Sequence, residues 1–179
     1  MVEIKITNLE QALGKIDAIP EKLTVGLTKA TDSLLDLVDE NVVQNLGSVR
    51  YGNGEINRQN HREIKCVKGM VKGRFWNDSE IGVYREFGTG PVGEENHSDI
   101  SPDVFPTYTQ DRWFIPVNDV DIDLQSVYGI PKIKIQGEEF FMTRGQPARP
   151  WMYPAGKKAE EQSEKIITQE VNKALKELE

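Results

Sequence analysis

The sequence predicts an α+β fold in which long N-terminal and C-terminal helices pack on an antiparallel β-sheet, with one long loop. Three observations support this prediction. Apolar residues recur at steps of three and four towards both ends of the chain, two segments between them alternate around glycine turns, and a stretch rich in proline has no periodicity. Runs of strands flanked by helices are typical of an α+β layer arrangement.

The first long helix is predicted over residues 20–47, because proline suits the first turn of a helix and glycine suits its end. Before it, we expect a short strand over residues 2–6 and a separate short helical segment from Asn8 to Ile16. The apolar stripe of the long helix consists of Leu23, Leu27, Ala30, Leu34, Leu37, Val38 and Val42.

The C-terminal helix is predicted to follow a proline-rich, aromatic stretch over residues 146–155. Glu160 and Glu161 are expected in its first turns, where carboxylates suit the positive end of the helix dipole. One face carries Ala159, Ser163, Ile166, Ile167, Val171, Ala174, Leu175 and Leu178.

Two hairpins are predicted between the helices, one over residues 61–77 with its turn at Lys68 and Gly69, and one over residues 130–144 around Gly137. We further expect a polar loop over 47–60, an extended or helical piece over 81–84 and a strand over 113–117. The long loop is predicted over residues 88–111, which are acidic and hold three prolines. A loop of this length is usually functional or disordered, and we expect it to be mobile until the protein assembles.

Length and composition favour a single domain over residues 1–179. The net charge of −7 argues against tight, non-specific binding to phosphate backbones. The one cysteine, Cys66, cannot form a disulfide within the chain, and we expect it to be buried and inert. No apolar N-terminal leader and no run of about 20 apolar residues is visible, so we expect folding in a cytoplasm and no membrane partner.

Several patterns suggest chemistry but have a simpler explanation. The letters G-x-G-x-x-G over residues 88–93 lack the strand and helix that a dinucleotide site needs, and Pro91 removes an amide. Asp119, Asp121 and Asp123 are expected on a charged edge strand rather than around calcium, since the glycine of a calcium loop is missing. We therefore predict no catalytic residue, no cofactor and no metal.

Two segments together resemble a known family. The first contains Tyr84, Glu86, Phe87, Gly88, Thr89 and Gly90 in an aromatic-x-Glu-Phe-Gly-Thr-Gly order. The second contains Arg149, Pro150, Trp151, Tyr153 and Pro154, and it leads into the last helix. This arrangement is similar to that of the tail-completion family, also described as minor tail components or head–tail joining proteins, of siphophages and prophages.

The resemblance implies a structural protein of the virion, assembled in the bacterial cytoplasm as a ring of six copies between the tail-tube protein and the head-connector proteins. It implies neither an enzyme nor a binder of specific nucleic-acid sequences. Two alternatives from other classes stay open. One is a small hydrolase-like enzyme that uses the acidic loop and His97, and the other is a nucleic-acid-binding module that uses the basic hairpin over residues 58–76.

Physical chemistry gives the second segment a structural role as well. Pro150 favours an extended backbone at Arg149, and Pro154 suits the first turn of the following helix. Trp151 and Tyr153 offer large apolar areas for burial. We expect the guanidinium of Arg149 to bind a carboxylate, with Glu86 as the candidate. Whether these residues serve the fold or contacts between subunits stays open.

Overall fold

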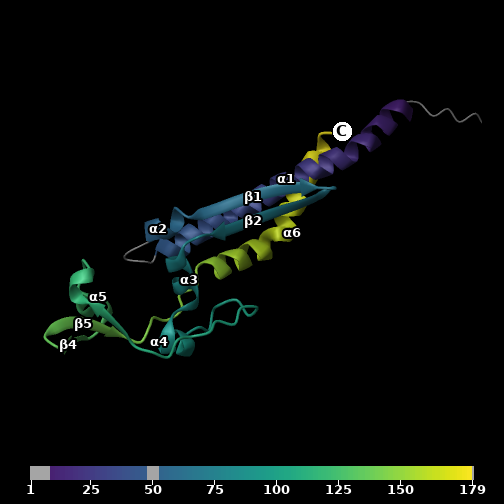
Figure 1. Cartoon of the computed structure of the whole chain (residues 1–179). Coiled ribbons are helices and arrows are strands. Elements are labelled where there is room, and N and C mark those ends of the chain that lie inside the picture. Colours follow the sequence, from purple (N-terminus) through teal and green to yellow (C-terminus); the bar gives the residue numbers. More distant parts are fainter. Residues whose placement is uncertain (1–8, 48–52, 179) are drawn as a thin grey trace, which may run out of the picture. The chain divides into compact units, whose positions relative to one another are not determined.

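The computed structural model describes residues 9–47 and 53–178, and the strand expected over residues 2–6 lies outside them. The chain divides into two compact units. Among the described residues, unit 1 comprises 9–44, 60–77 and 155–178, and unit 2 comprises 45–47, 53–59 and 78–154. Long helices near both ends and antiparallel strands between them confirm the predicted α+β class (Figure 1).

Helix α1 is one continuous helix, Leu9–Gly47, and not the two segments that were predicted. Pro20 lies inside it. A proline inside a helix removes one backbone hydrogen bond and crowds the preceding turn. Here Pro20 is exposed, and its carbonyl accepts a hydrogen bond of 2.9 Å from the hydroxyl of Thr24. The local cost of the proline is therefore not enough to end the helix, whereas the predicted end at Gly47 is confirmed.

Helix α6, Met152–Lys176, packs against α1 in unit 1. Gly26 of α1 is buried, and a Cβ atom there would lie 2.9 Å from the Cα atom of Val171. Ala174 of α6 is buried at the same contact. Small residues thus allow the two helices to approach closely. Because α6 begins at Met152, Glu160 and Glu161 lie well beyond its first turn, where the described helix has no acidic residue.

The first predicted hairpin is confirmed as β1, Asn60–Val67, and β2, Met70–Asn77. Its two turn residues, Lys68 and Gly69, have φ values of 52° and 75°. Positive φ at both central residues is what a type I′ turn requires, and this turn matches the twist of the strands. The hairpin runs alongside α1 (Figure 1), and a Cβ atom added to Gly73 would clash with Thr31 of that helix.

Cys66 is exposed and not buried as expected. It lies near the hairpin tip, where all residues from 65 to 70 are exposed. Alternation along a strand predicts which residues share a face, but not whether that face is covered.

Unit 2 contains a three-stranded antiparallel sheet in the order β3-β5-β4. Strands β4, Lys132–Ile135, and β5, Glu138–Thr143, form the second predicted hairpin, again with positive φ at both turn residues. Strand β3, Trp113–Pro116, pairs with the other side of β5. Phe141 on β5 is fully buried.

The three aspartates do not lie on an edge strand, which corrects the prediction. The segment forms a short 3-10 helix, η1 (Val117–Asp119), and then helix α5, Leu124–Tyr128. Asp123 caps α5 by accepting a hydrogen bond from the backbone N–H of Gln125, and Lys132 lies 3.1 Å from its carboxylate. The hydrogen bond from Lys132 is the main reason why the pKa of Asp123 is lowered.

Three short helices replace segments that were predicted as loops or left undecided. Helix α2, Asn53–Asn57, lies in the expected polar loop and buries Ile56. Helix α3, Glu80–Phe87, begins after Ser79, whose hydroxyl accepts the N–H of Gly82. Helix α4, Gly90–Glu95, occupies the start of the expected long loop, whose remainder up to residue 112 has no helix or strand.

Substitution of two glycines inside α1, Gly26 and Gly14, tests the close contact between α1 and α6. Gly26→Ala should destabilise the protein by about 1–3 kcal/mol, because the added methyl group meets the backbone of α6. Gly14→Ala in the same helix has open space around the added Cβ and should be neutral or stabilising by up to about 1 kcal/mol. Urea unfolding of both variants gives the comparison, and equal midpoints would contradict the contact.

Candidate functional site

The two segments that carry the resemblance lie side by side in unit 2. Thr89 and Gln146 form an antiparallel bridge, in which the N–H of Thr89 donates to the carbonyl of Gln146 at 2.9 Å. Further along, the N–H of Arg149 donates to the carbonyl of Arg85 at 2.8 Å. Backbone hydrogen bonds therefore join the two segments, although their residues lie about sixty positions apart in the sequence.

Glu86 lies at the centre of this arrangement, and its side chain is only 5% exposed. One carboxylate oxygen accepts hydrogen bonds from the backbone N–H groups of Trp151 at 2.6 Å and Met152 at 2.9 Å. The other oxygen accepts from the N–H of Tyr153 at 2.9 Å. The first N–H groups of a helix have no partner within the helix, and the dipole favours negative charge there. Glu86 therefore caps helix α6 from a distant position in the chain.

The predicted pair between Arg149 and Glu86 is wrong: the Glu86 carboxylate accepts hydrogen bonds from the backbone N–H groups of residues 151–153, and no ion pair joins it to Arg149 in the described structure. Arg149 is exposed and lies near Arg85 instead. Burial, and then the charge of Arg149, lower the pKa of Arg85. The Nε atom of Arg85 is buried without a hydrogen-bond partner. Within the described residues, neither guanidinium forms an ion pair with a carboxylate.

Trp151 is 2% exposed, in agreement with the expected burial. Its indole N–H donates to the carbonyl of Gly82 at 3.0 Å, and its own carbonyl accepts from the side chain of Asn45 at 2.9 Å. A buried indole needs such a partner, because its N–H would otherwise lose its bond to water. Pro154 lies in the first turn of α6 as predicted, and Pro150 precedes the helix.

Glycine is required at two positions of the first segment, because the backbone of residues 144–148 passes close to it. A Cβ atom at Gly88 would lie 2.7 Å from the backbone nitrogen of Ala148. At Gly90, φ is 59° and a Cβ atom would lie 2.5 Å from the carbonyl oxygen of Arg144. Thr89 between them supplies the bridge to Gln146. The Gly-Thr-Gly pattern is thus explained by a close approach of two backbones.

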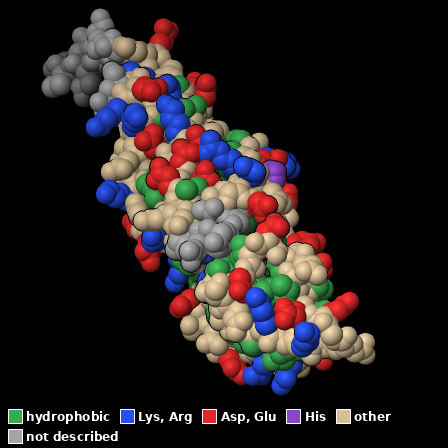
Figure 2. All heavy atoms as spheres, turned by 90° about the vertical axis from the view of Figure 1, so that its left-hand side faces the viewer, with side chains coloured by type: hydrophobic (Ala, Val, Ile, Leu, Met, Phe, Trp, Pro, Cys, Tyr) green, Lys and Arg blue, Asp and Glu red, His purple; other side chains and the backbone are tan. Residues whose placement is uncertain are grey.

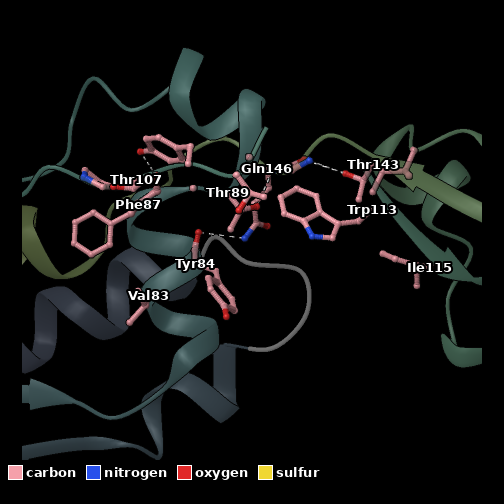
Figure 3. A pocket seen from close by; sticks show the side chains of 16 residues that line it. Val83, Tyr84, Phe87, Thr89, Thr107, Trp113, Ile115, Thr143 and Gln146 are labelled. Atoms are coloured by element: carbon pink, nitrogen blue, oxygen red, sulfur yellow. Dashed lines mark hydrogen bonds between the residues drawn. The ribbon is translucent and has the colours of Figure 1, made fainter. Parts of the chain in front are cut away.

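A cavity of about 730 Å³ opens beside this junction. Figure 3 shows Trp113 and Gln146 in its wall, with Tyr84, Val83 and Phe87 contributed by α3. Five residues of the first segment line it, namely Tyr84, Phe87, Gly88, Thr89 and Gly90. The cavity is not lined by Arg149, Pro150, Trp151, Tyr153 or Pro154 of the second segment. The backbone N–H groups of Trp151 and Tyr153 donate to Glu86 instead.

Sequence reasoning missed the rest of the cavity wall. Trp113 looked like an ordinary strand residue, and Tyr108 lay within a loop without periodicity. The hydroxyl of Tyr108 donates to the carbonyl of Phe87 at 2.8 Å and so holds the end of that loop against α3. Burial, and then the charge of Glu94, raise the pKa of Tyr108, so this donor keeps its proton. The only available signal was the density of aromatic residues over 105–114.

His97 of the enzyme alternative and the basic hairpin of the nucleic-acid alternative lie outside this cavity wall. The ring of His97 lies tilted against that of Tyr108, with 5.6 Å between their centroids, and its Nδ1 atom lies 3.1 Å from the carbonyl oxygen of Gly93. Where the structure describes the chain, no three His, Cys, Asp or Glu side chains are grouped as a metal site would need. The described helices include none with the length and apolar character needed to cross a membrane. On the basic hairpin, Arg62 pairs with Asp36 and Asp32 of α1.

Removal of the Glu86 charge tests the cap. Glu86→Gln replaces one acceptor oxygen with an NH₂ group that faces backbone donors, and it should destabilise the protein by about 2–4 kcal/mol. The matched control is Glu95→Gln, an exposed carboxylate in the same unit, for which a change within about 0.5 kcal/mol is expected. Denaturant unfolding measures both, and similar values for the two variants would show that Glu86 is not the cap.

Truncation of Trp151 tests the second anchor of the junction. Trp151→Ala should cost about 3–5 kcal/mol, as for a large buried aromatic side chain. Phe114→Ala, which truncates an aromatic side chain that is half exposed, should cost far less. A loss below about 1 kcal/mol for Trp151→Ala in urea titrations would mean that the indole is not buried.

Comparison of the chain with known protein families, with curated proteins and with solved structures finds no match.

Proposed function

We propose that this chain is a structural protein of a long-tailed bacteriophage, which completes the tail and joins it to the head connector through an oligomeric ring. The proposal starts from the resemblance of the two segments to the tail-completion family. In that setting, the protein assembles in the bacterial cytoplasm, becomes part of the virion, and needs no catalytic residue or cofactor.

The observation that carries the proposal is the meeting of the two segments at Glu86. A glutamate in the first segment supplies the cap of the helix that the second segment opens. This gives a physical reason why an aromatic-x-Glu-Phe-Gly-Thr-Gly segment and a Pro-aromatic-x-x-Pro-Ala segment belong together. Chance similarity between two short segments would not require them to touch.

The surface also suits assembly. Acidic and basic side chains are mixed over the visible face in Figure 2, with hydrophobic side chains between them. Residues 94–111 hold five carboxylates and no lysine or arginine, whereas residues 47–76 hold seven basic and two acidic side chains. Opposed local patches on one chain favour contacts between copies, in which the basic hairpin of one subunit meets the acidic segment of its neighbour.

The nucleic-acid alternative is weakened by the surroundings of the hairpin. Arg62 is paired with two aspartates of α1, and the guanidinium of Arg74 lies over the ring of Trp76 at 4.8 Å. The ring of Trp76 in turn stacks with His61 at 5.2 Å between centroids. These groups are occupied within the chain, so they are poorly placed to bind phosphates or stack on bases.

Sedimentation of the purified protein with and without tail-tube and connector proteins tests the proposal. We expect a ring of six copies that binds both partners. Association should weaken above about 0.15 M salt, where the Debye length falls below about 8 Å. Reversal of Lys68 and Lys72 to glutamate on the hairpin should weaken the ring more than the same reversal of Lys157 and Lys165 on α6, which are also exposed. A strict monomer that binds neither partner under any condition would overturn the proposal.

A further inference from the structure

The tip of the β1–β2 hairpin, residues 65–72, exposes an apolar pair. Val67 and Met70 lie directly opposite each other beside the turn, and they are 60% and 58% exposed. Residues directly opposite in an antiparallel pair share one face, and side chains alternate between faces along each strand. Gly73 therefore lies on the other face, which is the face in contact with Thr31 of α1. The apolar pair points away from this helix.

Three lysines surround the apolar pair. Lys65 and Lys72 lie opposite each other on the same face, and Lys68 lies in the turn. Like charges directly opposite each other destabilise a strand pair. Lys65 lies 2.8 Å from the carboxylate of Glu63, whereas Lys68 and Lys72 have no carboxylate paired with them in the described parts of the chain. The hairpin tip is therefore suited to a surface that is both apolar and acidic.

Residues 103–105 in unit 2 form a surface of this kind. Phe105 is 88% exposed, more than any other large apolar side chain of the described residues, and Val104 beside it is also exposed. Asp103 and Asp99 are exposed, and neither pairs with a lysine or arginine of the described residues. The segment belongs to the connection between α4 and β3, which has no helix or strand (Figure 1). A single exposed apolar residue needs no explanation, but this pair matches the hairpin tip in character and opposes it in charge.

We propose that the hairpin tip of one copy packs on residues 103–105 of a second copy. Val67 and Met70 lie against Phe105 in this contact, and the lysines of the tip face the carboxylates of the second copy. The inference rests on the proposed function, and it names the contact that builds the ring. Cys66 alternates with these apolar residues and so lies on the other face of the hairpin.

The charges also determine how the copies are arranged. Two hairpin tips would repel each other, and so would two acidic segments, so a symmetric pairing of either surface with itself is disfavoured. The two surfaces are different parts of one chain. A contact between them is heterologous, and it repeats from copy to copy until the ring closes.

Exchange of the charges tests this contact. One variant carries Lys68→Glu and Lys72→Glu, and a second carries Asp99→Lys and Asp103→Lys. Each variant alone should associate at least about tenfold more weakly than the unchanged chain in sedimentation at low salt. An equimolar mixture should associate within about threefold of the unchanged chain, because each acidic tip then meets a basic segment of the other variant. A mixture as weak as the separate variants would overturn the contact.

A control variant separates position from net charge. It joins Asp99→Lys and Asp103→Lys to Lys157→Glu and Lys165→Glu on α6, so its net charge equals that of the unchanged chain. Its hairpin tip and its acidic segment are then both basic, and its self-association should stay at least about tenfold weaker. Restored association of this variant would mean that net charge, and not the proposed contact, governs assembly.

Truncation of the aromatic ring provides the second arm. Phe105→Ala should raise the dissociation constant of the ring by at least about tenfold, as for an anchor residue at an interface. Phe114→Ala, at another exposed aromatic position of unit 2, should change it by less than about threefold. If Phe105→Ala forms the ring as well as the unchanged chain, this contact is wrong while the proposed function stands. If the unchanged chain never assembles with itself or with tail proteins, both are wrong.

Discussion

The carboxylate of Glu86 satisfies three consecutive backbone N–H groups at the start of helix α6, and the arrangement of unit 2 depends on it. A buried carboxylate is costly without partners, and buried N–H groups at a helix start are costly without acceptors. The hydrogen bonds between the carboxylate and the N–H groups offset both of these costs. The match places residues 149–153 against α3, which in turn lets Trp151 reach the carbonyl of Gly82.

This constraint also explains the neighbouring features. Once the second segment runs beside the first, the two backbones meet at Gly88 and Gly90, where a side chain would clash. The strand that follows the long connection then brings Trp113 towards the same junction, and the space left between them is the cavity in Figure 3. The motif residues thus hold the junction together, whereas Tyr108 and Trp113, outside the motif, complete the cavity wall.

The parts that the sequence predicted well depend on neighbours in the chain. Both hairpins were predicted because their turns need positive φ at two adjacent residues, and glycine marks such turns. The class, the end of α1 and the position of Pro154 follow from equally local rules. The failures involve distant contacts. Glu86 caps a helix that begins 66 residues later, and no spacing rule links them.

The remaining errors have specific causes. Pro20 stays within α1 because the helix on both sides outweighs one lost hydrogen bond. The three aspartates alternate as a strand would, but Asp123 is used as a helix cap, and local capping competes with extended structure. For the site, the motif residues were identified together, but the cavity was not, because Tyr108, Trp113 and Gln146 converge only in three dimensions.

Cys66 at the exposed hairpin tip has a practical consequence for any assembled form. The chain has one cysteine, so each copy carries one thiol that a maleimide dye can reach before assembly. A particle built from labelled chains then holds one fluorophore per copy. Counting single-molecule photobleaching steps would read the copy number directly, without any substitution in the protein.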